Sequence, residues 1–140
     1  MARGYPDFEG DKSGLYLKPE WAAYEGIDKN FRATGLNKAT LTWASFSYDV
    51  PAGKTLYICG ASMWIRGYAV EDRDNNQIGA LDLQNFTTAT HLVMVGGNGG
   101  CSVVLPKPLV IPGDDKFYGA FFNKSNHSCN IEGTAWGYEI

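Results

Sequence analysis

Charged residues are scarce in this chain of 140 residues, and neither sign dominates. They make up 19% of the sequence, and 12 lysines and arginines stand against 15 aspartates and glutamates, which gives a net charge of −3. A nucleic-acid partner needs a basic stripe that neutralises phosphates, and the sequence has none, so we expect no such partner. Because glycine and aromatic residues take the place of the missing charges, we expect another molecule to cover part of the surface.

Histidine and cysteine, which often carry metal or nucleophilic chemistry, are also few. His91 and His127 have no second histidine or glutamate at the spacing that a metal site on neighbouring strands requires. Cys59, Cys101 and Cys129 are an odd number without metal-ligand spacing, so we interpret them as reduced, buried side chains. A nucleophile and base made from one cysteine and one histidine has no flanking signature here. We therefore predict no metal, no cofactor and no enzymatic activity.

Long apolar runs are absent too. No segment approaches the roughly 20 apolar residues that span a bilayer. The first residues, Met1 to Asp7, lack the apolar core of a secretory signal. We therefore predict a protein that is made in a cytoplasm and that neither enters a membrane nor is secreted.

Two loops resemble ligand-binding motifs only in part. Residues 72–76 begin like a calcium loop, but Gln77 and Leu83 stand where that loop needs its glycine and its bidentate glutamate. Residues 96–100 are rich in glycine but lead into a predicted strand, whereas a phosphate-binding loop leads into a helix. A hairpin turn and a tight connection explain these two loops better.

A repeated turn-then-strand unit is the clearest positive signal in the sequence. At 50–58 and again at 111–118, a β-branched residue precedes proline, a glycine follows, and a run of strand-forming residues comes next. Proline lacks a backbone N–H and suits the start of a strand, and glycine permits the turn. Two such units predict a β-domain with two sheets, and 140 residues are enough for one domain with a real core.

From residue 41 onward, β-prone runs alternate with turn signals at intervals of roughly 8 to 12 residues, which is typical of a sandwich or barrel. No helical period interrupts them. The predicted fold is therefore all-β, a jelly-roll type two-sheet sandwich over residues 41–140. The expected strands lie at 41–48, 54–70, 77–83, 88–95, 101–105, 109–111, 116–122 and 129–140.

Residues 1–40 show no lasting period and are predicted to form an extended N-terminal arm. One short helix is expected in it, because Pro19 suits a first helical position and Gly26 suits a stop. Aromatic side chains spaced along a polar segment are typical of docking segments. The arm either wraps its own domain or docks on a neighbouring subunit, and its expected anchors are Tyr5, Phe8, Tyr16 and Trp21.

The last predicted strand, 129–140, has two unlike faces. Small or apolar residues occupy every second position from Cys129, so this side is expected to approach the opposite sheet closely. The other side carries Trp136 and Tyr138 beside polar residues, a mixture typical of a subunit contact. The alternative is that these two aromatic residues cover their own core under a loop.

In their cadence, residues 50–58, 105–113 and 131–140 resemble the small jelly-roll structural proteins of tailed phages and related virions. Such proteins pair a strand led by proline and glycine with a later second copy, and they end on a strand of glycine, aromatic and acidic residues. The resemblance covers roughly residues 46–140. It implies a virion component without an enzymatic site, often a trimer on a capsid lattice or in a tail or fibre.

We therefore expect a capsid decoration or cement protein, a homotrimer that binds the major capsid protein or another virion protein and resides in the virion. A tail, baseplate or fibre component is the alternative within that class. Outside it, exposed tryptophans such as Trp21, Trp64 and Trp136 would suit stacking on sugars, which leaves a carbohydrate-binding module open.

Overall fold

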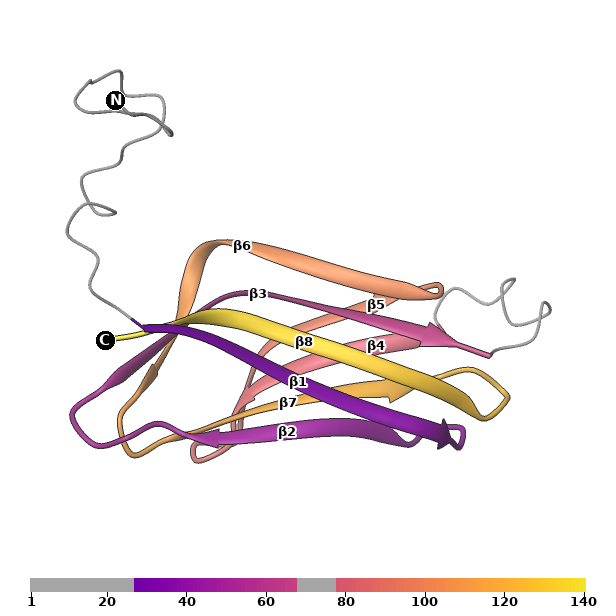
Figure 1. Cartoon of the computed structure of the whole chain (residues 1–140), viewed down its shortest axis with the longest axis horizontal. Coiled ribbons are helices and arrows are strands. Elements are labelled where there is room, and N and C mark those ends of the chain that lie inside the picture. The colour runs from indigo at the N-terminus through magenta and orange to yellow at the C-terminus, as the bar shows by residue number, and fades with distance from the viewer. Residues whose placement is uncertain (1–26, 68–77) are drawn as a thin grey trace, which may run out of the picture.

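The computed structural model describes residues 27–67 and 78–140, which form two layers of strands (Figure 1). No helix in these two ranges is long and apolar enough to cross a membrane. The strands of the described ranges are β1 (Ile27–Lys38), β2 (Trp43–Asp49), β3 (Thr55–Arg66), β4 (Gly79–Asn85), β5 (Thr90–Gly97), β6 (Gly100–Pro112), β7 (Lys116–Asn123) and β8 (Cys129–Glu139).

The strands form two antiparallel sheets with the orders β1-β8-β3-β6 and β2-β7-β4-β5. The pairing is nested: β1 pairs with β8, β2 with β7, β3 with β6 and β4 with β5. A long hairpin wound into a two-sheet sandwich produces this order, which is that of a jelly roll. The predicted fold class, an all-β sandwich of the jelly-roll type, is confirmed.

The core lies between the inner faces of the two sheets. Its largest fully buried side chains come from both sheets and include Phe117, Phe121, Leu56 and Ile58. Full burial of an apolar side chain of this size stabilises the fold by roughly 1.5–3 kcal/mol. The alternation of buried and exposed residues along most strands therefore reflects one face against the core and one face toward solvent.

The inner face of β8 carries small residues, as the sequence predicts. Cys129, Ile131 and Ala135 are buried, and Gly133 lies against the ring of Phe121 from the opposite sheet. A Cβ atom built on Gly133 would overlap that ring. The small face of the strand therefore makes room for a large aromatic side chain.

The two proline-glycine turns lie side by side. Lys54 N donates to Pro51 O at 3.0 Å within the first turn, where Gly53 has a φ of 78°. The turns are joined because Val50 N donates to Asp115 O at 2.9 Å and Asp114 N donates to Val50 O at 2.9 Å. The repeated unit in the sequence thus closes one end of the sandwich.

The sandwich begins at Ile27, earlier than the boundary near residue 40 that the sequence suggests. β1 pairs with β8 from Ile27 to Gly35, so residues 27–38 of the predicted arm belong to the sheet. The inward positions of β1 carry Phe31, Ala33 and Gly35, and because two of these are small, the strand leaves little alternation in the sequence. The predicted short helix between Pro19 and Gly26 and the turn at 72–76 lie outside the described residues.

One strand replaces the two expected at 101–105 and 109–111. β6 runs through Pro106 and Pro108, which is tolerated because β6 is an edge strand and needs ladder bonds on one side only. The register shifts where Ile58 pairs with Leu109 and Gly60 pairs with Val104. β3 continues through this shift as a single strand.

Candidate functional site

Two tryptophans stand on the outer face of the β1-β8-β3-β6 sheet. Trp136 on β8 is paired with Gly60 on β3, and Trp64 on β3 is paired with Glu132 on β8. The two positions are four residues apart along the strands, or about 13 Å. The intervening pair is Ser62 with Thr134. The register therefore places two large aromatic rings at the ends of a short polar strip.

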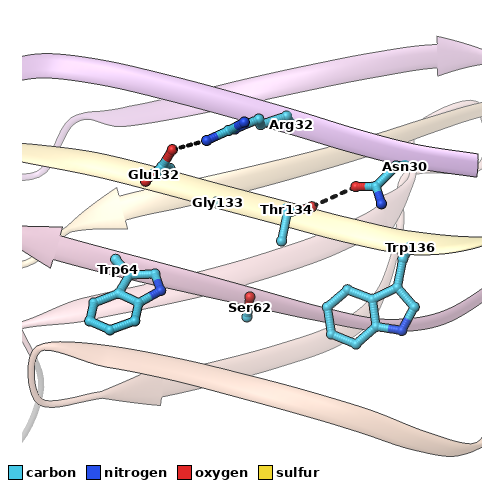
Figure 2. A pocket seen from close by; sticks show the side chains of 8 residues that line it. All are labelled: Asn30, Arg32, Ser62, Trp64, Glu132, Gly133, Thr134 and Trp136. Atoms are coloured by element: carbon cyan, nitrogen blue, oxygen red, sulfur yellow. Dashed lines mark hydrogen bonds and ion pairs between the residues drawn. The ribbon is translucent and has the colours of Figure 1, made fainter.

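An open groove with a volume of about 420 Å³ follows this strip (Figure 2). This volume falls in the range of small-molecule sites. The lining side chains come from three neighbouring strands, with Trp64 and Trp136 at its two ends and Asn30, Arg32, Ser62, Glu132 and Thr134 between or beside them. We call it the tryptophan groove.

Both indole rings of the tryptophan groove offer a face. The ring of Trp136 lies against the backbone at Gly60, where a Cβ atom would overlap it. Trp64 is 63% exposed. Figure 2 shows both rings turned broadside to the viewer, with Ser62 and Thr134 between them. Because Gly60 has no side chain, the indole ring of Trp136 can pack flat against the backbone of the sheet.

One carboxylate forms ion pairs with two arginines at the Trp64 end of the groove. Glu132 forms ion pairs with Arg32 and with Arg66, the second at 3.5 Å. The hydrogen bond and charge of Arg32, helped by the charge of Arg66, hold the pKa of Glu132 below its ordinary value of 4.5. All three side chains reach solvent, so the pairs orient the groups more than they stabilise the fold.

We predict that an Arg32→Gln variant raises the pKa of Glu132 toward 4.5, because it removes the strongest partner of the carboxylate. A pH titration of the Glu132 side chain by NMR measures this. The folded-state pKa is below the unfolded one, so the ion pair stabilises the fold above pH 4.5 and loses its effect as the pH falls through the folded pKa. An Arg66→Gln variant is the control with the smaller rise, and equal shifts in both would contradict the assignment.

Hydrogen-bonding groups of the groove are only partly used. The Thr134 hydroxyl lies 3.0 Å from Asn30 Oδ1 and 2.9 Å from the carbonyl oxygen of Phe31. Within the described ranges, the indole N–H groups of Trp64 and Trp136 have no hydrogen-bond partner. These N–H groups and the amide of Asn30 are available to a ligand.

The outer face of the other sheet carries a group of aromatic side chains. Trp43 lies 5.5 Å from Phe122 between ring centroids, and Phe86 lies 5.2 Å from Tyr118. The indole N–H of Trp43 donates to the Tyr118 hydroxyl at 3.2 Å, which links the two pairs. Met94, on the neighbouring strand β5, is also exposed. We call these five side chains the aromatic face.

A buried carboxylate lies within this second sheet. Asp82 accepts a hydrogen bond from Gln84 Nε2 at 2.8 Å, and His91 Nδ1 lies 3.0 Å from both Asp82 oxygens. No local sequence pattern indicates the pair of Asp82 and His91, because β4 and β5 must be paired in register before these residues meet. Across the described ranges, no three histidine, cysteine, aspartate or glutamate residues gather as a possible metal site.

The burial of the cysteines agrees only in part with the sequence-based prediction. All three are free thiols, and Cys129 is buried with its sulfur 3.1 Å from the Ser125 hydroxyl. Cys59 and Cys101 are half-buried rather than buried, which corrects the expectation for them. Both lie on the sheet that carries the groove, and burial raises the pKa of each thiol, which favours the protonated form.

Two of the six predicted contact residues lie in the described ranges. Trp136 and Tyr138 both stand on the outer face of the first sheet, where Tyr138 stacks on Tyr57 with 4.9 Å between ring centroids. They therefore do not cover the core between the sheets. Tyr5, Phe8, Tyr16 and Trp21 lie outside the described residues.

No known protein family matches the sequence of this chain, and no curated protein matches it either. The two outer faces, one with a polar groove and one with an aromatic cluster, are therefore the features from which a function is inferred.

Proposed function

We propose that this chain is a structural protein of a virion, a capsid decoration protein that holds to its neighbours by protein–protein contacts. The observation that carries the proposal is the aromatic face. Trp43, Phe86 and Met94 are 45%, 54% and 69% exposed. Grouped apolar side chains that remain in solvent mark interaction sites more often than isolated ones do.

The composition of the aromatic face is that of an interface centre. Aromatic residues and methionine are enriched there, and charge is depleted. The carboxylate of Asp82 lies beneath the surface with His91 and Gln84 on it. The exposed ion pair of Lys116 and Asp49, at 3.2 Å, lies at the strand end, where a polar rim belongs.

The fold supports the proposal by analogy only. Viral capsid proteins and lectins both use jelly rolls, so the architecture fits a virion protein but does not select one. The proposed mechanism is adhesion. Each contact buries apolar surface at roughly 25 cal/mol per Å², and repetition over a shell multiplies weak contacts by avidity.

We predict that the purified chain is a trimer, near three times 15.3 kDa by light scattering on a sizing column. A Trp43→Ser/Phe86→Ser double variant is expected to be a monomer, because it removes two exposed rings from the aromatic face. Circular dichroism should show the same β-sheet signal for both proteins.

A Tyr138→Ser variant on the opposite face is the matched comparison. The sequence predicts Tyr138 as a contact residue, whereas the aromatic face predicts that its loss leaves the trimer intact. Dissociation by Tyr138→Ser alone would move the contact to the first sheet. A monomeric parent chain would contradict the trimer.

Location in a virion is tested separately. Antibodies raised against the purified chain are expected to label the shell of intact particles from its source in electron microscopy. Label confined to tails or fibres would support the alternative component within the same class. No label on any particle would contradict the proposed function.

A further inference from the structure

We propose that the tryptophan groove binds a neutral oligosaccharide. The inference goes beyond the proposed function and does not depend on it, because the groove and the aromatic face lie on the outer faces of opposite sheets. A chain that contacts its neighbours in a virion through the aromatic face would leave the tryptophan groove free to bind a glycan.

The two indole rings supply the stacking surfaces. A pyranose ring has a face of C–H groups, and such a face packs against the electron-rich face of an aromatic ring. Trp64 is largely exposed, and the ring of Trp136 packs flat against the backbone at Gly60. The ring of Trp136 is therefore in place before a ligand arrives, which reduces the entropy cost of binding, and the ring of Trp64 is open to the ligand.

The strip between the rings suits sugar hydroxyls, which both donate and accept hydrogen bonds. Ser62 and Thr134 contribute hydroxyls, Asn30 contributes an amide, and the indole N–H groups add donors at both ends. The groove thus offers both donors and acceptors to sugar hydroxyls.

The charges of the groove favour a neutral ligand. The lining side chains include one arginine and one glutamate, Arg32 and Glu132, which form an ion pair with each other, so the lining carries no net charge. A nucleic acid would also stack on aromatic rings, but it needs unpaired cations along its phosphates. The net charge of −3 disfavours a polyanion further.

The spacing of the rings favours several sugar units over one. The tryptophans stand about 13 Å apart along the strands, so one pyranose cannot cover both. Figure 2 shows Ser62 and Thr134 between the two rings, and the groove is open to solvent there. The ligand class is therefore a linear oligosaccharide whose separate rings meet Trp64 and Trp136.

The test uses the full chain with neutral hexasaccharides of glucose, xylose, mannose and N-acetylglucosamine, first on an array and then by titration calorimetry. At least one hexasaccharide is expected to bind, and its monosaccharide at least tenfold more weakly. Trp64→Ala and Trp136→Ala variants are each expected to lose at least tenfold in affinity. Leu36→Ala, which removes an exposed apolar side chain of β1 that lines neither the groove nor the aromatic face, is the control and should bind as the parent chain does.

Trp64 is mostly exposed, so its loss does not endanger folding and keeps the test decisive. The inference is overturned if no neutral oligosaccharide binds, if only acidic sugars bind, or if both groove variants bind unchanged. These results do not depend on the oligomeric state measured by light scattering. The oligosaccharide proposal and the virion proposal can therefore fail separately.

Discussion

A Gly133→Ala variant is expected to lose about 3 kcal/mol of unfolding free energy, because it adds a methyl group where a core has no room. The added Cβ would overlap ring atoms of Phe121, including the Cγ that joins the ring to its own backbone. Phe121 is fully buried and cannot swing into solvent. The midpoint of thermal unfolding should fall by roughly 10 °C.

A second substitution tests the cause. Phe121→Leu alone leaves a cavity and is destabilising, but in a Gly133→Ala/Phe121→Leu double variant the smaller side chain makes room for the methyl group. The double variant is therefore expected to lose less than the sum of the two single losses. Gly79→Ala is the control, because the atom nearest to its Cβ is the flexible end of Met63, at 3.1 Å. Equal losses for Gly79→Ala and Gly133→Ala would contradict the assignment.

Asn123→Asp is expected to cost about 3 kcal/mol at neutral pH, since it leaves buried carbonyl groups without donors and adds a buried charge. Asn123 is fully buried at the end of β7. Its Nδ2 donates to Lys38 O at 2.8 Å and to His127 O at 2.7 Å, and its Oδ1 accepts from Ser125 N and Oγ. One amide thus ties the end of β1 to the turn before β8.

The loss should depend on pH with a known sign. Burial beside two carbonyl oxygens raises the folded-state pKa of the introduced carboxyl group above its unfolded value. Lowering the pH therefore recovers stability, because the protonated group regains one donor. Urea unfolding at pH 7 and at pH 5 measures this, relative to the parent chain at each pH.

The matched control is Asn130→Asp. Asn130 is exposed, and its Oδ1 accepts from Asn37 N at 3.0 Å, a role that a carboxylate keeps. Its expected effect is small. If it destabilised the fold as much as Asn123→Asp, the buried amide network would not be the cause.

The strands could be read from the sequence where large side chains alternate, and not where they are small. β8 was predicted face by face because Trp136 and Tyr138 contrast with Gly133 and Ala135. The sequence does not indicate β1 as a strand, because its buried side holds the small residues Ala33 and Gly35. Local chemistry indicates that a strand exists, but the partner strand determines where it begins and ends.

The candidate site can be predicted from the sequence only in part, because it also depends on which strands pair. Trp64 and Trp136 were named as exposed aromatic residues, but their alignment depends on the pairing of β3 with β8. The aromatic face was not anticipated, because Trp43 and Phe122 are brought together by the β2–β7 register. Propensities describe residues close in sequence, whereas some seventy or more positions separate Trp64 from Trp136 and Trp43 from Phe122.

The nested strand order has a consequence for the order of events in folding. β4 and β5 are joined by a short turn, whereas the outermost pair, β1 and β8, brings Ile27 beside Glu139 (Figure 1). Contacts between distant residues form slowly, because a large loop must close before they contribute stability. β8 also lies between β1 and β3, so the sheet that carries the tryptophan groove is complete only after β8 has paired with strands far from it in the sequence. The groove is therefore expected to form later than the β4–β5 hairpin.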